Sequence, residues 1–89
     1  MTVVERKTVI ERLKRVLRET LQLGDQVNAF DESTGLFGSI PEFDSMAVVN
    51  VVSGLEEQFD IEIDDDDITA EIFETVGALT HYIQGKLAD

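Results

Sequence analysis

The sequence predicts an all-α fold, a small four-helix bundle with three main helices, one short helix and a long first loop. Apolar residues recur every three or four positions in three separate segments, which is the spacing of one face of an α-helix. The chain has 89 residues, 43% of them hydrophobic, so it has room for one modest core. We therefore expect a single domain over residues 1–89.

The first helix is expected from about Val3 to Gly24. Thr2 and Glu5 have the spacing of a capping box, which favours a helix start between them. Gly24 is a typical residue just after a helix end. One apolar stripe runs between these two signals and consists of Ile10, Leu13, Leu17 and Leu21.

The first loop is expected over residues 22–44, where helical periodicity disappears. Gly35, Gly38 and the single proline, Pro41, are typical of turns. Apolar residues interrupt this polar stretch, namely Phe30, Leu36, Phe37, Ile40 and Phe43. We expect them to fold back over the core as packing residues rather than to form a binding site.

The second helix is expected to begin at a cap formed by Asp44 or Ser45 and to run to about Phe59. Successive residues in a helix are separated by about 100°, which sorts this segment into two faces. The core face holds Val48, Val51, Val52, Leu55 and Phe59. The outward face holds Met46, Asn50, Ser53, Gly54 and Glu57, with Val49 at its rim.

A short helix is expected near residues 69–73, and the last helix is expected from about Thr75. The last segment has one apolar stripe, formed by Val76, Leu79, Ile83 and Leu87. Gly77 and Gly85 lower its helical stability by about 1 kcal/mol each relative to alanine. The bundle is therefore held together mainly by packing of these stripes.

The charge of the chain is strongly segregated. The formal net charge is −12, yet six of the seven basic residues lie in the first 18 positions, and residues 19–85 contain sixteen acids and no base. Nucleic acid and anionic membranes would be repelled by such a surface. Partner proteins with basic patches are its natural complement, and simple solubility is the alternative interpretation.

The expected compartment is the cytoplasm. No apolar run reaches the roughly 18 residues that span a bilayer, so we expect no membrane insertion. The first residues lack the layout of a signal peptide. The chain has no cysteine, which excludes disulfides and thiolate metal sites. We expect a monomer.

Ser45 is the candidate functional residue. A catalytic serine needs a base, and the sequence has one histidine, His81, in the last helix. The residues around Ser45 also lack the two glycines of a nucleophile elbow. An ordinary N-cap serine is one interpretation. The other is a serine that carries a phosphoester, which the free N–H groups and the dipole at a helix N-terminus would stabilise.

The segment from Phe43 to Ile63 resembles the acyl carrier proteins. Their hallmark is an Asp-Ser-Leu triplet, followed by an apolar helix that ends in an acidic stretch and a phenylalanine. This chain has Asp44-Ser45-Met46 and then Leu55-Glu56-Glu57-Gln58-Phe59. The helix order, the long first loop and the acidic balance are similar too, so the resemblance covers nearly the whole chain.

The resemblance implies that Ser45 carries a 4'-phosphopantetheine arm taken from coenzyme A, whose thiol holds acyl groups as thioesters. It implies that the chain is not an enzyme and that Asp44 lies where a phosphopantetheinyl transferase works with magnesium. The other implied partners are acyl-loading and acyl-accepting enzymes. The alternative is an acidic interaction module without a prosthetic group, in which Ser45 is only a helix cap.

The sequence departs from the common pattern at Met46, where leucine is usual, and at Ala47 and Asn50, where acids are frequent. The segment from Ser45 to Phe59 is more similar to stand-alone carriers associated with exosortase and exopolysaccharide gene clusters. For partner recognition we expect the exposed residues of the second helix, namely Met46, Val49, Glu56 and Glu57.

The acidic run in the second half is the candidate metal site and consists of Asp64, Asp65, Asp66 and Asp67. Adjacent carboxylates suit magnesium or calcium, but the run lacks the alternating ligands of an EF-hand loop. A solvated run is the first expectation and weak divalent binding the second. A zinc site is not expected, since the chain has no cysteine and one histidine.

Overall fold

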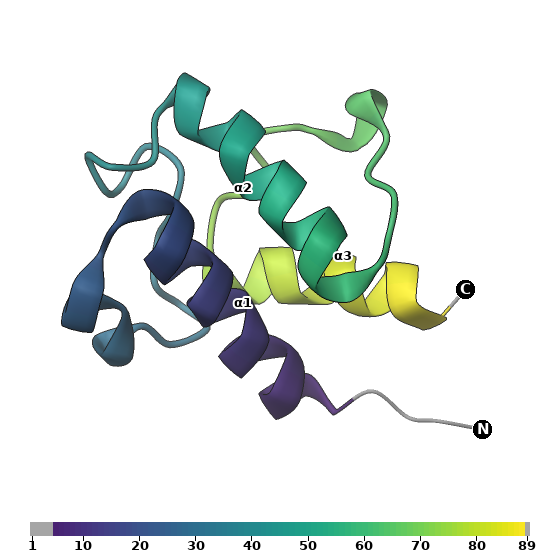
Figure 1. Ribbon diagram of the computed structural model, residues 1–89, viewed down its shortest axis with the longest axis horizontal. Helices are drawn as coiled ribbons and strands as arrows, with labels where there is room; N and C mark the ends of the chain where they lie inside the picture. The colour runs from purple at the N-terminus through teal and green to yellow at the C-terminus, as the bar shows by residue number, and fades with distance from the viewer. Residues whose placement is uncertain (1–4, 89) are drawn as a thin grey trace.

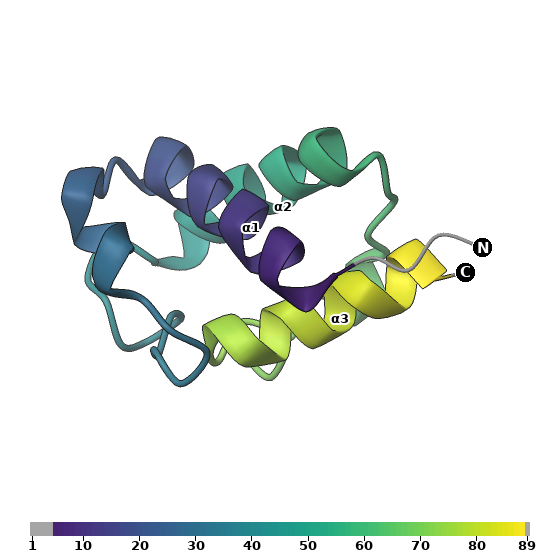
Figure 2. The same cartoon turned by 90° about the horizontal axis from the view of Figure 1, so that it is seen from below.

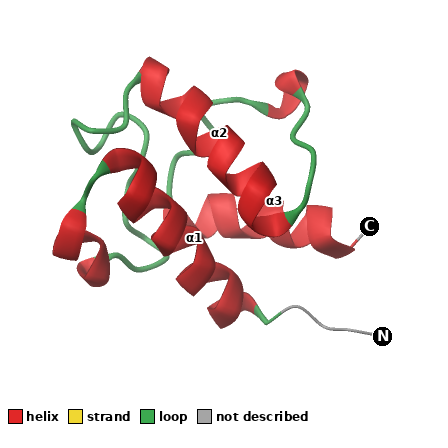
Figure 3. Cartoon of the chain, in the orientation of Figure 1, coloured by secondary structure: helices red, strands yellow, loops and turns green. Residues whose placement is uncertain are grey.

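The structure is a computed structural model that describes residues 5–88. Its elements are α1 (Arg6–Leu21), η1 (Gly24–Ala29), α2 (Ser45–Phe59), η2 (Asp65–Asp67) and α3 (Val76–Ala88), where η denotes a 3-10 helix (Figures 1 and 3). In these residues the extended pairing is a single antiparallel bridge between Gly35 and Thr75. The predicted all-α class is confirmed.

The three α-helices surround one core. α1 and α2 run in opposite directions beside each other, and α1 also packs against α3, which lies across one side of this pair (Figure 2). Their apolar stripes meet in the centre, which removes them from water and drives the assembly. The fully buried residues include Val9, Leu13, Leu17, Leu36, Val51, Leu55, Val76, Leu79 and Ile83.

The bounds of α1 differ from the prediction. The helix follows Glu5, which has an extended backbone and is its N-cap. The expected start at Val3 and the expected capping residue Thr2 lie outside the described residues. The helix ends at Leu21 rather than near Gly24, because Gln22 adopts a left-handed conformation with φ of 54°. Gly24, with φ of 60°, instead begins η1.

The first loop covers the core, as predicted. Leu36 and Phe43 are buried, and the other three apolar residues of the loop pack partly buried against the core. Backbone hydrogen bonds hold it to the segment before α3, from Leu36 N–H to the Glu74 carbonyl and from Phe37 N–H to the Phe73 carbonyl, each 2.9 Å. The sequence did not predict η1, whose one buried residue is Val27.

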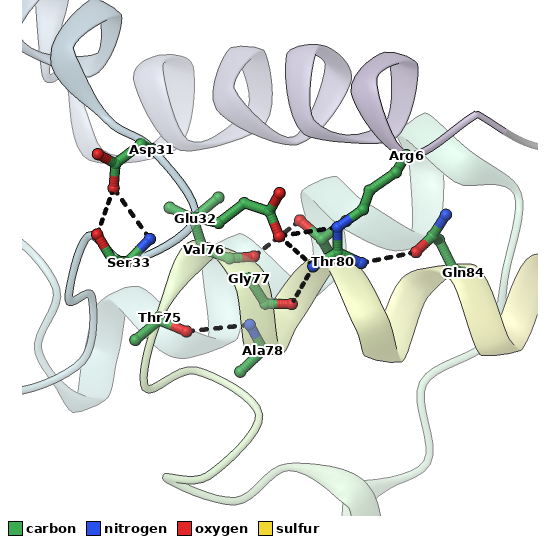
Figure 4. A network of polar contacts seen from close by, with 10 residues as sticks. All are labelled: Arg6, Asp31, Glu32, Ser33, Thr75, Val76, Gly77, Ala78, Thr80 and Gln84. Atoms are coloured by element: carbon green, nitrogen blue, oxygen red, sulfur yellow. Dashed lines mark hydrogen bonds and ion pairs between the residues drawn. The ribbon is translucent and has the colours of Figure 1, made fainter.

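Arg6 joins the start of α1 to the loop and to α3 (Figure 4). Its guanidinium forms an ion pair with Glu32 and donates a hydrogen bond of 2.9 Å to Gln84 Oε1. The Gly77 N–H donates to the backbone carbonyl of Glu32 at 2.9 Å. The loop is thus fixed against α3 from both its side chains and its backbone.

The prediction of a short helix at residues 69–73 is wrong. The helical turn is η2, four residues earlier, and residues 70–73 form turns. Ile63 and Phe73 are both buried, so the segment between them must return to the core within ten residues. The expected start of α3 is confirmed, and Thr75 Oγ1 accepts a hydrogen bond of 3.0 Å from Ala78 N–H.

The faces of α2 agree with the prediction except at two residues. Val48 is half-buried rather than fully in the core. Gly54 faces α1 instead of solvent, because a Cβ atom there would lie only 2.9 Å from Val16 Cγ1 and 3.3 Å from Thr20 Cγ2. In the part of the chain that the structure describes, no helix has the length and apolar character needed to cross a bilayer.

Candidate functional site

The site begins at the N-terminus of α2, where Asp44 is the helix cap. Its backbone is extended, with φ of −102° and ψ of −176°, and its Oδ1 accepts a hydrogen bond of 2.9 Å from Ala47 N–H. Its carbonyl oxygen accepts from Val48 N–H at 3.1 Å. Asp44 therefore satisfies part of the first turn, as N-cap aspartates do.

Ser45 is the first residue of α2 and is exposed. Among the described residues its hydroxyl has no hydrogen-bond partner, in contrast to the capping carboxylate beside it. His81 lies exposed on α3, and within residues 5–88 no hydrogen bond joins it to Ser45. The arrangement is therefore not that of a serine activated by a base. It presents an accessible hydroxyl at a helix N-terminus.

A small cavity of about 220 Å³ opens beside Ser45. Three segments form its wall: the first loop, α2 and the stretch after η2. The lining residues are Phe37, Ser45, Val48, Ile68, Thr69, Ala70 and Phe73. Most of them are apolar, so the cavity suits an apolar or amphipathic group better than an ion.

Aromatic packing holds two of the lining residues, Phe37 and Phe73, in place. The Phe43 ring lies 5.6 Å from the Phe73 ring and 6.0 Å from the Phe37 ring, the latter edge to face. Phe37 thus packs on the core and also lines the cavity. Phe37 packs over the core as expected, and its position beside the cavity was not foreseen from the sequence. Chain periodicity gave no signal of the cavity, because its walls come from segments far apart in sequence.

The exposed apolar residues of α2 lie as predicted. Met46 is 78% exposed and Val49 is 65% exposed. Glu57 is exposed as well. Glu56 is only half-buried and has a structural contact, since its Oε2 accepts a hydrogen bond of 2.9 Å from Ile63 N–H. Of the two glutamates expected to recognise partners, Glu57 is the more available.

The acidic run Asp64–Asp67 is held against α3. The Asp67 carboxylate accepts a hydrogen bond of 2.8 Å from the Tyr82 hydroxyl, and Lys86 Nζ lies 3.7 Å from Asp67 and 3.9 Å from Asp64. Burial of the phenol, together with the Asp67 hydrogen bond and charge, raises the pKa of Tyr82 well above its ordinary value. This contact was not foreseen from the sequence.

The described residues contain no group of three or more histidines, aspartates or glutamates that could hold a metal ion. The geometry of the described residues therefore gives no support to the weak divalent binding considered for Asp64, Asp65, Asp66 and Asp67. Two of the four carboxylates instead contact Lys86. Through Asp64 and Asp67, the acidic run forms a structural contact with α3.

Comparisons with known proteins agree on one family. The family described as "Phosphopantetheine attachment site" matches residues 11–83. An acyl carrier protein of Desulforapulum autotrophicum is 37% identical over 79 residues, covering 89% of this chain and 97% of the relative. An acyl carrier protein of Buchnera aphidicola is 35% identical over 80 residues, covering 90% and 94%.

The same likeness extends to a solved structure. The solution NMR structure of a holo acyl carrier protein from Nitrosomonas europaea is 45% identical to this chain, with a TM-score of 0.85. The match covers 90% of this chain and 96% of that one. The arrangement of helices described above is therefore shared with a carrier that was solved in its holo form.

Proposed function

This chain belongs to the phosphopantetheine-binding acyl carrier proteins, and on that premise we propose that Ser45 is the residue to which its 4'-phosphopantetheine arm is attached. The single observation that carries the proposal is the exposed, unbonded hydroxyl of Ser45 at the first position of α2, beside the Asp44 cap. The alternative of an acidic module without a prosthetic group is not favoured by the family match.

The residues at this position fit the group. A phosphodiester on Ser45 would place its negative charge at the helix N-terminus, where the backbone dipole favours an anion. The Asp44 carboxylate already accepts a hydrogen bond from Ala47 N–H. The N–H groups of Ser45 and Met46 donate to no acceptor among residues 5–88. The apolar cavity beside Ser45 is ready to shield part of an attached chain from water.

The family relationship defines what the chain does, and the site suggests how. The arm, when attached, supplies a thiol that holds acyl groups as thioesters. Ser45 contributes the attachment oxygen, and Asp44 keeps the helix end closed while its carboxylate remains exposed toward a transferase. Carriers of this family are not catalysts, and we propose that separate enzymes perform every chemical step on this chain too.

A carrier must meet a phosphopantetheinyl transferase and the enzymes that handle its acyl cargo. We propose that they dock on the outward face of α2 through Met46 and Val49, with Glu57 and neighbouring acids facing basic residues of the partner. An apolar anchor within a polar rim is a common arrangement of interface hot spots. The exposure of both apolar side chains supports this proposal.

Three further features of the chain remain proposals: its domain extent, its compartment and its subtype within the family. We propose that residues 1–89 act as a single carrier domain, which the span of the family match over residues 11–83 supports. We also propose that the chain acts in the cytoplasm, the compartment expected from its sequence. The relation to exosortase-associated carriers rests on the sequence from Ser45 to Phe59 and stays a prediction.

The test of Ser45 is the intact mass of the protein after incubation with coenzyme A, magnesium and a broad-specificity transferase. The wild-type chain should gain the mass of one phosphopantetheine, and Ser45→Ala should gain none. Ser53→Ala is the matched control, because Ser53 is an exposed serine of the same helix, and it should gain the same mass as wild type. Modification of Ser45→Ala would refute the assignment.

A further inference from the structure

The basic residues of α1 are divided between internal contacts and an exposed surface. Arg6 pairs with Glu32. The Arg12 guanidinium lies 4.8 Å from the centre of the Phe59 ring and so fastens α1 to α2. The other four basic residues of α1 form no ion pair among residues 5–88, namely Lys7, Lys14, Arg15 and Arg18.

Three of these four cations line one groove of about 300 Å³, between α1 and η1. Arg15 and Arg18 are three residues apart and share a face of the helix, and both are exposed. Lys14 Nζ donates a hydrogen bond of 3.1 Å to the Phe30 carbonyl, a neutral group that leaves its charge uncompensated. We call this surface the α1 groove; its lining is completed by Glu11 and Asn28.

The turn between α1 and η1 creates the groove. Gln22 and Gly24 both have positive φ angles, which reverses the chain so that η1 folds back beside the end of α1 (Figure 1). Buried Val27 holds η1 in that position. The groove is therefore a fixed feature of the fold, and it shares no lining residue with the cavity at Ser45.

The groove is positive in a protein of net charge −12. Its occupant must be an anion small enough to avoid the acids elsewhere on the surface. Screening confines charge interactions to about 8 Å at physiological ionic strength, so a short acidic segment can meet the α1 groove without facing α2. Nucleic acid or an anionic membrane extends well beyond that range, and a second copy of this chain has its own net charge of −12.

We propose that the α1 groove docks a short segment of a partner protein rich in aspartate and glutamate. The guanidinium groups of Arg15 and Arg18 present planar forks that match carboxylates, and Asn28 offers a neutral amide beside them. Docking there leaves Ser45 and the outward face of α2 free. One partner can then hold the carrier by α1 while a second enzyme works on the attached arm.

The test uses the full chain, labelled with ¹⁵N, and a fluorescein-labelled hexaglutamate peptide at low and physiological salt. Amide shifts should change along α1 and η1, and peptide affinity should fall roughly fivefold to tenfold in Arg15→Gln/Arg18→Gln. Lys7→Gln is the matched control, since Lys7 is exposed on the same helix but outside the groove, and it should stay within about twofold of wild type.

A second variant tests the opposite direction. Glu11 is the one acid that lines the groove, so Glu11→Gln should tighten hexaglutamate binding about twofold or more. Equal affinity in wild type and Arg15→Gln/Arg18→Gln, or shifts confined to other elements, would overturn the proposal. Two other results would also overturn it if the peptide does not bind at the same salt. One is binding to phosphatidylserine vesicles that depends on Arg15 and Arg18, and the other is dimer formation in sedimentation that depends on the same two residues.

Discussion

Asp44 and Ser45 are adjacent but have different physical tasks. The Asp44 carboxylate accepts a hydrogen bond from Ala47 N–H and closes the first turn of α2. The Ser45 hydroxyl makes no such bond among the described residues and stays exposed. A substitution at Asp44 can therefore affect stability through the cap, or modification through the carboxylate, and the two effects can be separated.

Asn is as good an N-cap as Asp, whereas Ala loses the cap at a cost of about 1 kcal/mol. We expect Asp44→Asn to melt close to the wild-type temperature and Asp44→Ala to melt about 4–8 °C lower. If the carboxylate assists the transferase and magnesium, both variants should be modified more slowly than wild type. The measurements are thermal melts and initial rates of modification. A wild-type rate in Asp44→Asn would limit Asp44 to capping.

Met46 should matter for partners and not for folding. It is 78% exposed, so Met46→Ala removes little buried area and should leave the melting temperature within a few degrees. We expect transferase turnover to slow several-fold, because the side chain is a proposed contact anchor. Leu55→Ala is the control for the stability assay, since Leu55 is fully buried and its truncation costs about 2–5 kcal/mol. Unchanged turnover would show that Met46 is not an anchor.

The sequence was informative about residues whose environment follows from local periodicity. The exposure of Met46 and Val49, and the cap at Asp44, depend only on the phase of one helix. The cavity beside Ser45 depends on Phe37 and Phe73, which reach it from separate loops. The structural contact of Glu56 with Ile63 N–H likewise depends on how the chain leaves α2. Periodicity carries no information on such contacts.

At the scale of elements, the three α-helices were predictable, and the 3-10 helices within the connections were not. The bounds of α2 and the start of α3 agree with the capping and periodicity signals. η1 and η2 have too few residues to show an apolar stripe, so their positions are set by tertiary contacts. Gly54 was placed on the outward face because a helical wheel does not include the neighbouring helix, and α1 lies against this residue.

The two glycines of α3 provide a matched pair. A Cβ atom on Gly85 would meet no atom within 4 Å, whereas one on Gly77 would lie 2.9 Å from the Glu32 backbone oxygen. Gly85→Ala should therefore raise the free energy of unfolding by about 0.5–1 kcal/mol through helix propensity. Gly77→Ala should lower it by about 1–3 kcal/mol, because the loop must move away. Denaturant unfolding measures both, and equal effects would contradict the close contact of loop and helix.

Tyr82 links α3 to η2 and makes this contact measurable. Burial and the Asp67 hydrogen bond raise the pKa of its phenol above the ordinary value near 10. A raised pKa in the folded state means that the stabilisation is complete below about pH 10 and is lost as the pH rises through the folded-state pKa. The chain has one tyrosine, so phenolate absorbance in the ultraviolet reports this residue alone.

We expect Tyr82 in the folded chain to ionise at a higher pH than in the unfolded chain. Melting temperatures should fall above about pH 10 in wild type, and this fall should be smaller in Tyr82→Phe, which has no ionising group. Asp67→Asn is a second control, because it keeps a hydrogen-bond acceptor but removes the charge that raises the pKa. A phenol that titrates at its ordinary pKa in the folded chain would contradict the contact.

At the scale of the whole molecule, charge is separated along the fold. α1 carries six of the seven basic residues, while residues 19–85 carry sixteen acids and no base. Attraction between α1 and the rest favours the fold, and repulsion among the acids opposes it. The net charge of −12 indicates that repulsion is the larger effect. Salt screens both, so it should relieve more repulsion than it removes attraction.

Salt should therefore shift stability and partner binding in opposite directions. Raising sodium chloride from about 0.01 M to 0.5 M shortens the Debye length from about 30 Å to less than 8 Å, so the melting temperature should rise as the acids repel one another less. Over the same range the affinity for a transferase with a basic surface should fall, because the attraction that guides docking is screened as well. Thermal melts and binding titrations in matched buffers measure how melting temperature and affinity change with salt.

A melting temperature that falls with salt would mean that the attraction between α1 and the acidic remainder dominates. An affinity that does not change would exclude charge-guided docking on α2.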